Sequence, residues 1–122
     1  MRMQMILAVL TTVALTAPAW ADDYPVSGRW GQSTSTQQGT IDCAGKRVIG
    51  FSGNQRTDSN GGVPAYRNRS VSNDGGGYRI VDEFTTGQIS NAHTTYTLRQ
   101  TDSDHLEMTQ QGGPTLTLQR CK

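Results

Sequence analysis

The sequence has few of the large apolar residues that build an extensive core, and its charges almost cancel. Its 122 residues include two Trp and two Phe, and aromatic residues make up 7% of the chain. The chain has eleven Lys and Arg residues and ten Asp and Glu residues, which gives a net charge of +1. Such a balance provides no field that would attract nucleic acid or an anionic membrane. We therefore expect no nucleic-acid partner.

Cysteine is also scarce. Cys43 and Cys121 are the only two, and they lie too far apart for the Cys-x-x-Cys spacing of redox and zinc sites. We expect them to form a disulfide, with two free thiols or a metal pair as the alternatives. A bridge closing so long a loop would stabilise the fold by about 4–5 kcal/mol in the chain-entropy model.

One hydrophobic run stands out, and it lies near the start of the chain. Residues 5–15 are mainly apolar, Arg2 precedes them, and Ala19 and Ala21 follow in a small-x-small arrangement. This pattern predicts a secretory signal peptide at 1–21 and a single mature domain at 22–122. The run is too short to span a bilayer as a helix, so we expect no stable membrane insertion. The expected location is the periplasm or the extracellular medium.

Patterns that mark common active sites are missing. The sequence has no Gly-x-Ser-x-Gly motif, and its two histidines, His93 and His105, have no obvious catalytic partners. Asp102, Asp104 and His105 are expected in a solvated turn, with a metal site as the alternative. We therefore predict a protein that is not an enzyme and that carries no cofactor and no metal.

Alternating apolar and polar residues predict β-strands throughout the mature chain. The expected strands are 26–33, 39–43, 46–52, 63–71, 77–86, 90–100, 104–110 and 115–121. The candidate core consists of Trp30, Ile41, Val48, Ile49, Phe51, Val63, Tyr66, Val71, Tyr78, Ile80, Val81, Phe84, Ile89, Tyr96, Leu98, Leu106, Met108, Leu116 and Leu118.

Gly, Asn and Asp residues separate these strands by short turns, as in a meander. Residues 53–62 are rich in Gly, Asn, Ser and Asp and predict an exposed loop. An eight-stranded meander hides its edges by closing, so the expected fold is all-β, a small antiparallel up-and-down barrel. A two-sheet β-sandwich is the alternative. We expect a monomer.

Gly28-Arg29-Trp30 on the first predicted strand and Arg120 on the last one resemble the calycin superfamily, which includes lipocalins and avidins. The resemblance implies that Trp30 closes the bottom of the barrel and that Arg120 packs over its ring. In size and export the chain is also similar to small bacterial periplasmic barrels such as inhibitors of secreted metalloproteases. The spacing of Cys43 and Cys121 departs from the short-range disulfide of those inhibitors.

Five residues are candidate contacts for a ligand or partner. Arg67 and Arg69 share one face of a predicted strand, opposite Tyr66, and two arginines can seat a carboxylate. Asp82 shares the parity of Phe84 and is expected at the rim or the surface, with an inward position in a pocket as the alternative.

These features predict non-catalytic binding. The first hypothesis is a small ligand held in the barrel mouth. The alternative is an inhibitor or interaction module that presents residues 53–62 to an exported enzyme such as a protease.

Overall fold

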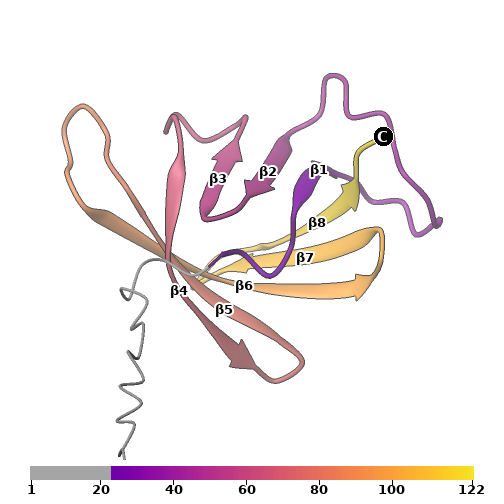
Figure 1. The fold of residues 1–122 in the computed structure, drawn as a ribbon. Coiled ribbons are helices and arrows are strands. Elements are labelled where there is room, and N and C mark those ends of the chain that lie inside the picture. Colours follow the sequence, from indigo (N-terminus) through magenta and orange to yellow (C-terminus); the bar gives the residue numbers. More distant parts are fainter. Residues whose placement is uncertain (1–22) are drawn as a thin grey trace, which may run out of the picture.

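Eight antiparallel strands close into a barrel in the computed structural model, which describes residues 23–122 (Figure 1). Each strand pairs with the next, and β8 pairs with β1, so the sheet has no open edge. The strands are β1 (Gly28–Gln32), β2 (Val48–Ser52), β3 (Gln55–Asp58), β4 (Tyr66–Asp74), β5 (Gly77–Phe84), β6 (Ala92–Asp102), β7 (His105–Gln110) and β8 (Thr115–Arg120). The predicted closed barrel is confirmed, and it is consistent with a calycin-like fold. No helix in residues 23–122 is long and apolar enough to cross a membrane.

The connections divide the barrel into two ends. Because consecutive strands run antiparallel, the β1–β2, β3–β4, β5–β6 and β7–β8 connections leave from one end, which we call the loop end. The other three turns and the two ends of the described chain leave from the opposite side, which we call the terminal end. The predicted signal peptide, with Ala19 and Ala21, lies outside the described residues.

Two of the predicted segments are wrong. Residues 39–43 form no strand and contribute only an isolated bridge between Ile41 and Cys121. Conversely, the predicted loop at 53–62 contains β3, whose four residues pair with β2. The inward-facing member of β3 is Arg56, so this strand lacks the alternation of apolar residues that marks the others.

Nine of the nineteen residues predicted for the core are buried, and nine others are only partly buried: Ile41, Val48, Val63, Tyr66, Val71, Tyr78, Val81, Phe84 and Leu116. The buried apolar residues are Tyr24, Trp30, Ile49, Phe51, Ile80, Tyr96, Leu98, Leu106, Met108 and Leu118. Tyr24 precedes the first strand and packs its ring edge-on against Phe51. Ile89, predicted for the core, is instead 56% exposed in the β5–β6 connection, where no neighbouring strand covers it.

Trp30 and Arg120 meet at the terminal end. The Cζ atom of Arg120 lies 4.3 Å from the centroid of the Trp30 ring, and the indole N–H donates to the Ser27 carbonyl. The Arg120 guanidinium also donates to the carbonyl of Ser103 in the β6–β7 turn. Gly28 adopts a φ of 93° beside this guanidinium, a conformation that favours glycine. The arginine therefore joins the first strand, the last strand and a turn.

The predicted disulfide is confirmed between Cys43 and Cys121, whose Cα atoms lie 5.6 Å apart. It ties the β1–β2 connection to the end of the chain. A side chain at Gly31 would overlap the Cys43 sulfur, so glycine lets the bridge lie directly on β1. A structural disulfide indicates that the protein folds in an oxidising compartment.

Reduction of this bridge tests its contribution. We expect reductant to lower the free energy of unfolding by about 4 kcal/mol, because the bridge closes a loop of 78 residues in the unfolded chain. Chemical denaturation with and without reductant measures the change. The variant carrying Cys43→Ser and Cys121→Ser should have the stability of the reduced protein, and reductant should not change it. Equal stability of the oxidised and reduced forms would contradict the prediction.

Candidate functional site

An ion pair lies inside the barrel. The Nε atom of Arg56 on β3 donates to Oδ2 of Asp82 on β5 at 2.7 Å, and the two residues are 1% and 0% exposed. Removing two charges from water costs several kcal/mol for each ion, so such a pair persists only where its geometry and its other hydrogen bonds compensate. The sequence expectation that Asp82 lies at the rim or the surface is therefore wrong.

Aromatic rings enclose the pair. The Arg56 guanidinium lies 3.8 Å from the centroid of the Tyr66 ring and 4.9 Å from that of Tyr96. The Tyr96 hydroxyl donates to Oδ2 of Asp82 at 2.8 Å. Burial, above all, raises the pKa of Tyr96, so the hydroxyl keeps the proton that it donates. The cation is stacked and the carboxylate has two donors on one of its oxygens.

Several polar atoms beside the pair have no protein partner. They are Oδ1 of Asp82, both amide atoms of Asn68 and the hydroxyl of Tyr24, and all four atoms are buried. Asn68 lies directly opposite Asp82 in the pairing of β4 with β5. Burial and the charge of Asp82 raise the pKa of Tyr24, so its hydroxyl stays protonated. Buried polar groups normally find partners, which makes this cluster of unpartnered atoms unusual.

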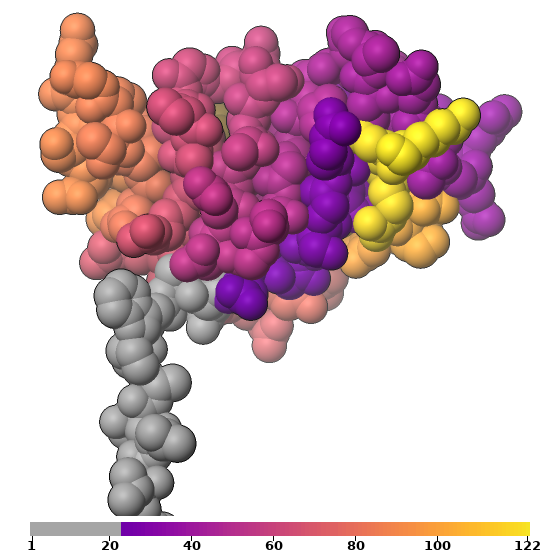
Figure 2. All heavy atoms as spheres, turned by 45° about the horizontal axis from the view of Figure 1, so that its top comes forward, coloured from indigo at the N-terminus to yellow at the C-terminus, as the bar shows by residue number. Residues whose placement is uncertain are grey.

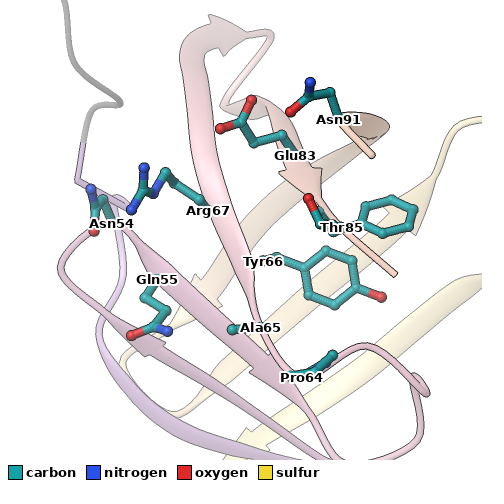
Figure 3. A pocket seen from close by; sticks show the side chains of 10 residues that line it. Asn54, Gln55, Pro64, Ala65, Tyr66, Arg67, Glu83, Thr85 and Asn91 are labelled. Atoms are coloured by element: carbon teal, nitrogen blue, oxygen red, sulfur yellow. The ribbon is translucent and has the colours of Figure 1, made fainter. Parts of the chain in front are cut away.

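A pocket of about 450 Å³ lies between the start of β3, the start of β4 and the end of β5. We call it the mouth pocket, and its lining residues are Asn54, Gln55, Pro64, Ala65, Tyr66, Arg67, Glu83, Phe84, Thr85 and Asn91. Figure 3 shows the Tyr66 ring and the Arg67 side chain on opposite sides of β4. The pocket therefore combines an aromatic part that faces the barrel interior with a charged rim.

The pairing of the strands explains why the pocket forms here. Only two residue pairs join β3 to β4, Gln55 with Arg67 and Arg56 with Tyr66. Beyond them the strands separate toward the loop end. Figure 2, which brings that end toward the viewer, shows a small opening between the magenta and pink segments that include β3 and the β3–β4 connection.

The structure distributes the five predicted contact residues among three environments. Tyr66, Arg67 and Phe84 line the mouth pocket, with the two aromatic rings edge-on at 5.3 Å. Asp82 lies in the interior. Arg69 lies on the outer surface and pairs with Glu83 at 3.0 Å.

Two features of this site escaped sequence analysis. A register shift between Asn68 and Ser70 interrupts the simple alternation on which the shared face of Arg67 and Arg69 was predicted. The sequence analysis places Arg56 in an exposed loop. An inward-facing Asp82 would need a cation beside it, and this need is the signal that could have identified Arg56 as buried.

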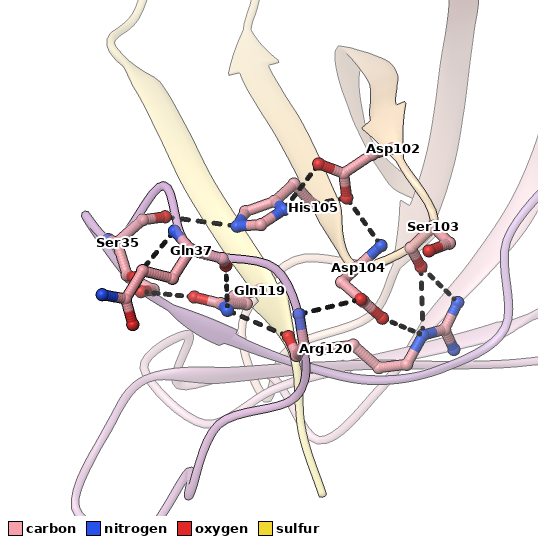
Figure 4. Close-up of polar contacts among 10 residues, drawn as sticks. Ser35, Gln37, Asp102, Ser103, Asp104, His105, Gln119 and Arg120 are labelled. Atoms are coloured by element: carbon pink, nitrogen blue, oxygen red, sulfur yellow. Dashed lines mark hydrogen bonds and ion pairs between the residues drawn. The ribbon is translucent and has the colours of Figure 1, made fainter.

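A second polar network surrounds His105 (Figure 4). Its Nδ1 atom lies 2.8 Å from a carboxylate oxygen of Asp102, and its Nε2 atom lies 3.2 Å from the carbonyl oxygen of Ser35. Both partners only accept, so the protonated imidazole, in which both ring nitrogens donate, satisfies both contacts. His105 is buried rather than solvated, so the expectation of a solvated turn is wrong for this residue. Residues 23–122 contain no group of three or more His, Cys, Asp or Glu side chains that could hold a metal ion.

Neighbouring contacts fix the β1–β2 connection to this network. The Gln119 amide donates to the carbonyls of Gln37 and Gly39, and Oδ2 of Asp104 accepts from the backbone N–H of Gly39. The network therefore anchors a long connection that has no strand of its own.

Comparisons of the chain with family models, with curated proteins and with solved structures return no match. The site must therefore be interpreted from its own chemistry.

Loss of one partner of the buried ion pair should destabilise the protein strongly. We expect Arg56→Met to lower the free energy of unfolding by about 3–5 kcal/mol, because Asp82 would keep a buried charge without a cation. The triple variant Arg56→Met, Asp82→Leu and Tyr96→Phe should recover most of that loss, since it removes the charges and the hydroxyl together. Urea denaturation measures both. A small effect of Arg56→Met would show that the pair is not buried.

The His105 network should make stability depend on pH. The hydrogen bond to Asp102 raises the pKa of His105 above its ordinary value of 6.5, and the same bond lowers the pKa of Asp102 below 3.8. The histidine therefore stabilises the fold fully below pH 6.5 and ceases to do so as pH rises through its folded pKa. The aspartate contributes above pH 3.8 and loses its contribution as pH falls through its folded pKa.

Melting temperatures between about pH 6 and about pH 9 test this dependence. His105→Gln should abolish the fall in melting temperature on the alkaline side. The matched control is His93→Gln, because His93 is exposed and only approaches Glu83 at 4.0 Å. An unchanged pH profile in His105→Gln would contradict the assignment.

Proposed function

We propose that this protein is an exported, non-catalytic binding protein that holds a small ligand in the mouth pocket. The observation that carries the proposal is the pocket itself. Its volume of about 450 Å³ is that of ordinary small-molecule sites, and it combines aromatic rings with a few polar groups. Tyr66 and Phe84 offer faces and edges for stacking, and Arg67 and Glu83 stand opposite each other in the strand pairing.

The packing of the rest of the barrel supports a ligand at the mouth rather than deep inside. Trp30, Leu98, Leu106 and Leu118 are each at most 1% exposed and occupy the interior toward the terminal end. The ligand would therefore lie at the loop end, above the ion pair of Arg56 and Asp82.

The disulfide supports the exported location, and the signal peptide predicted at 1–21 agrees with it. Membership of the calycin superfamily is part of the same proposal. The contact of Arg120 with the Trp30 ring supports it, because that contact is the one the resemblance implies.

A second candidate function is an interaction module that docks through the β5–β6 connection. Residues 85–91 carry no charged side chain, and Ile89 near their end is 56% exposed. The loop is ordered by Thr86, whose hydroxyl accepts from the N–H groups of Gln88 and Ile89 and whose N–H donates to the Ile89 carbonyl. Figure 1 shows this connection extending from the barrel at the upper left. It replaces residues 53–62, which contain β3, as the candidate docking loop.

Native mass spectrometry of the protein, recovered from its own exported fraction, tests both candidates. We expect a retained small-molecule mass, and Tyr66→Ala should lower the liganded fraction by at least about tenfold because the pocket loses an aromatic wall. Tyr78→Ala is the matched control, since Tyr78 is the second residue of β5 and lies at the terminal end.

A protein-sized added mass that Ile89→Asn removes and Tyr66→Ala leaves would favour the interaction module instead. A bare protein mass in every sample would overturn the proposal of a resident small ligand.

A further inference from the structure

The connection between β3 and β4 contains the only Asn-Gly pair of the sequence, Asn60-Gly61. It lies at the loop end, a few residues before Tyr66 of the mouth pocket. Asn60 is exposed, and its backbone N–H donates to Oδ1 of Asp58 at 3.0 Å. The residue therefore presents its side-chain amide to water.

An exposed asparagine followed by glycine can lose its side-chain amide without an enzyme. The backbone nitrogen of Gly61 attacks the side-chain carbonyl carbon of Asn60. A new C–N bond forms, the bond to the side-chain nitrogen breaks, and ammonia leaves with the N–H proton of Gly61. Water then opens the resulting cyclic imide at either of its carbonyls, which gives aspartate or isoaspartate. Glycine favours the first step because no Cβ hinders the approach of its nitrogen.

The fold holds the attacking nitrogen by a single hydrogen bond. The N–H of Gly61 donates to the carbonyl of Asp58 at 3.2 Å, which is at the long end of the usual range. Breaking one hydrogen bond in a surface connection costs far less free energy than unfolding the barrel. The reaction can therefore start from the folded protein.

Gly61 also lies directly against Tyr66. A Cβ atom at Gly61 would be 3.2 Å from the Tyr66 hydroxyl oxygen, so the glycine backbone is packed close to that hydroxyl. Tyr66 lines the mouth pocket and stacks on the Arg56 guanidinium. An isoaspartate at position 60 routes the main chain through the former side chain and lengthens it by a methylene group. Such a lengthening must move Gly61, which supports the Tyr66 ring.

We propose that Asn60-Gly61 is a site of spontaneous deamidation, and that the isoaspartate formed there displaces Tyr66 at the wall of the mouth pocket. Newly folded and aged molecules then differ in that wall. The aspartate product keeps the original main chain and adds only an exposed charge, which water screens. The backbone change, and not the charge, is therefore what moves the ring.

The rate of conversion is the first test. The oxidised protein is incubated in mildly alkaline buffer, and the exchange of NH₂ for OH is followed by mass spectrometry of the intact chain and its peptides. We expect conversion at Asn60 to be at least about tenfold faster than at Asn91, which is also exposed but precedes Ala92. The variant Asn60→Gln should show no conversion at position 60, because its longer side chain closes a ring far more slowly. Equal rates at Asn60 and Asn91 would overturn the proposal.

NMR spectra of the Tyr66 ring test the displacement. Aged protein should show a second set of Tyr66 resonances whose share follows the isoaspartate fraction. Freshly prepared Asn60→Asp, which has the charge but not the lengthened main chain, should keep the original set, and so should incubated Asn60→Gln. An unmoved Tyr66 in converted protein would overturn the displacement, as would a second set in fresh Asn60→Asp.

These outcomes do not depend on the proposed function. Both readouts concern the protein without a ligand, so a mouth pocket that binds nothing would leave the conversion of Asn60 and the shift of Tyr66 unchanged. Conversely, an unmodified Asn60 would leave the proposed ligand site as it is.

Discussion

The ion pair between Arg56 and Asp82 is the contact on which the arrangement of this barrel depends. It joins β3 to β5 across the interior, although β4 lies between them in the sheet. Neither charge could remain in the interior alone. The contact of Arg56 with Asp82 therefore holds the short β3 in the barrel wall. Tyr66 from β4 and Tyr96 from β6 complete the enclosure.

This constraint gives the barrel two chemically different halves. The terminal end is filled by aliphatic side chains and covered by Trp30 and Arg120, with the disulfide close by. The loop end instead holds the charged pair, the unpartnered atoms of Asn68 and Asp82, and the mouth pocket. The packed apolar half gives the polar half a rigid support, so that its polar groups keep their positions.

Sequence patterns predicted those parts of the fold that depend on simple periodicity or pairing. Alternating apolar residues identified most strands, and two distant cysteines in a chain with a predicted export signal identified the bridge. The patterns missed β3 because its inward residue is an arginine, and they placed Ile89 in the core because hydrophobicity alone does not reveal an exposed loop. Asp82 and Asn68 could not be placed either, since their burial follows from partners distant in the sequence.

Exchange of the Arg56 Nε proton reports whether Arg56 is buried and hydrogen-bonded to Asp82. In NMR spectra near neutral pH, we expect a distinct Arg56 Nε–H resonance that exchanges only as fast as the barrel unfolds globally. The exposed Arg99 serves as the reference within the same spectrum. Exchange of Arg56 at the rate of Arg99 would place the guanidinium in contact with solvent and would rule out a buried ion pair with Asp82.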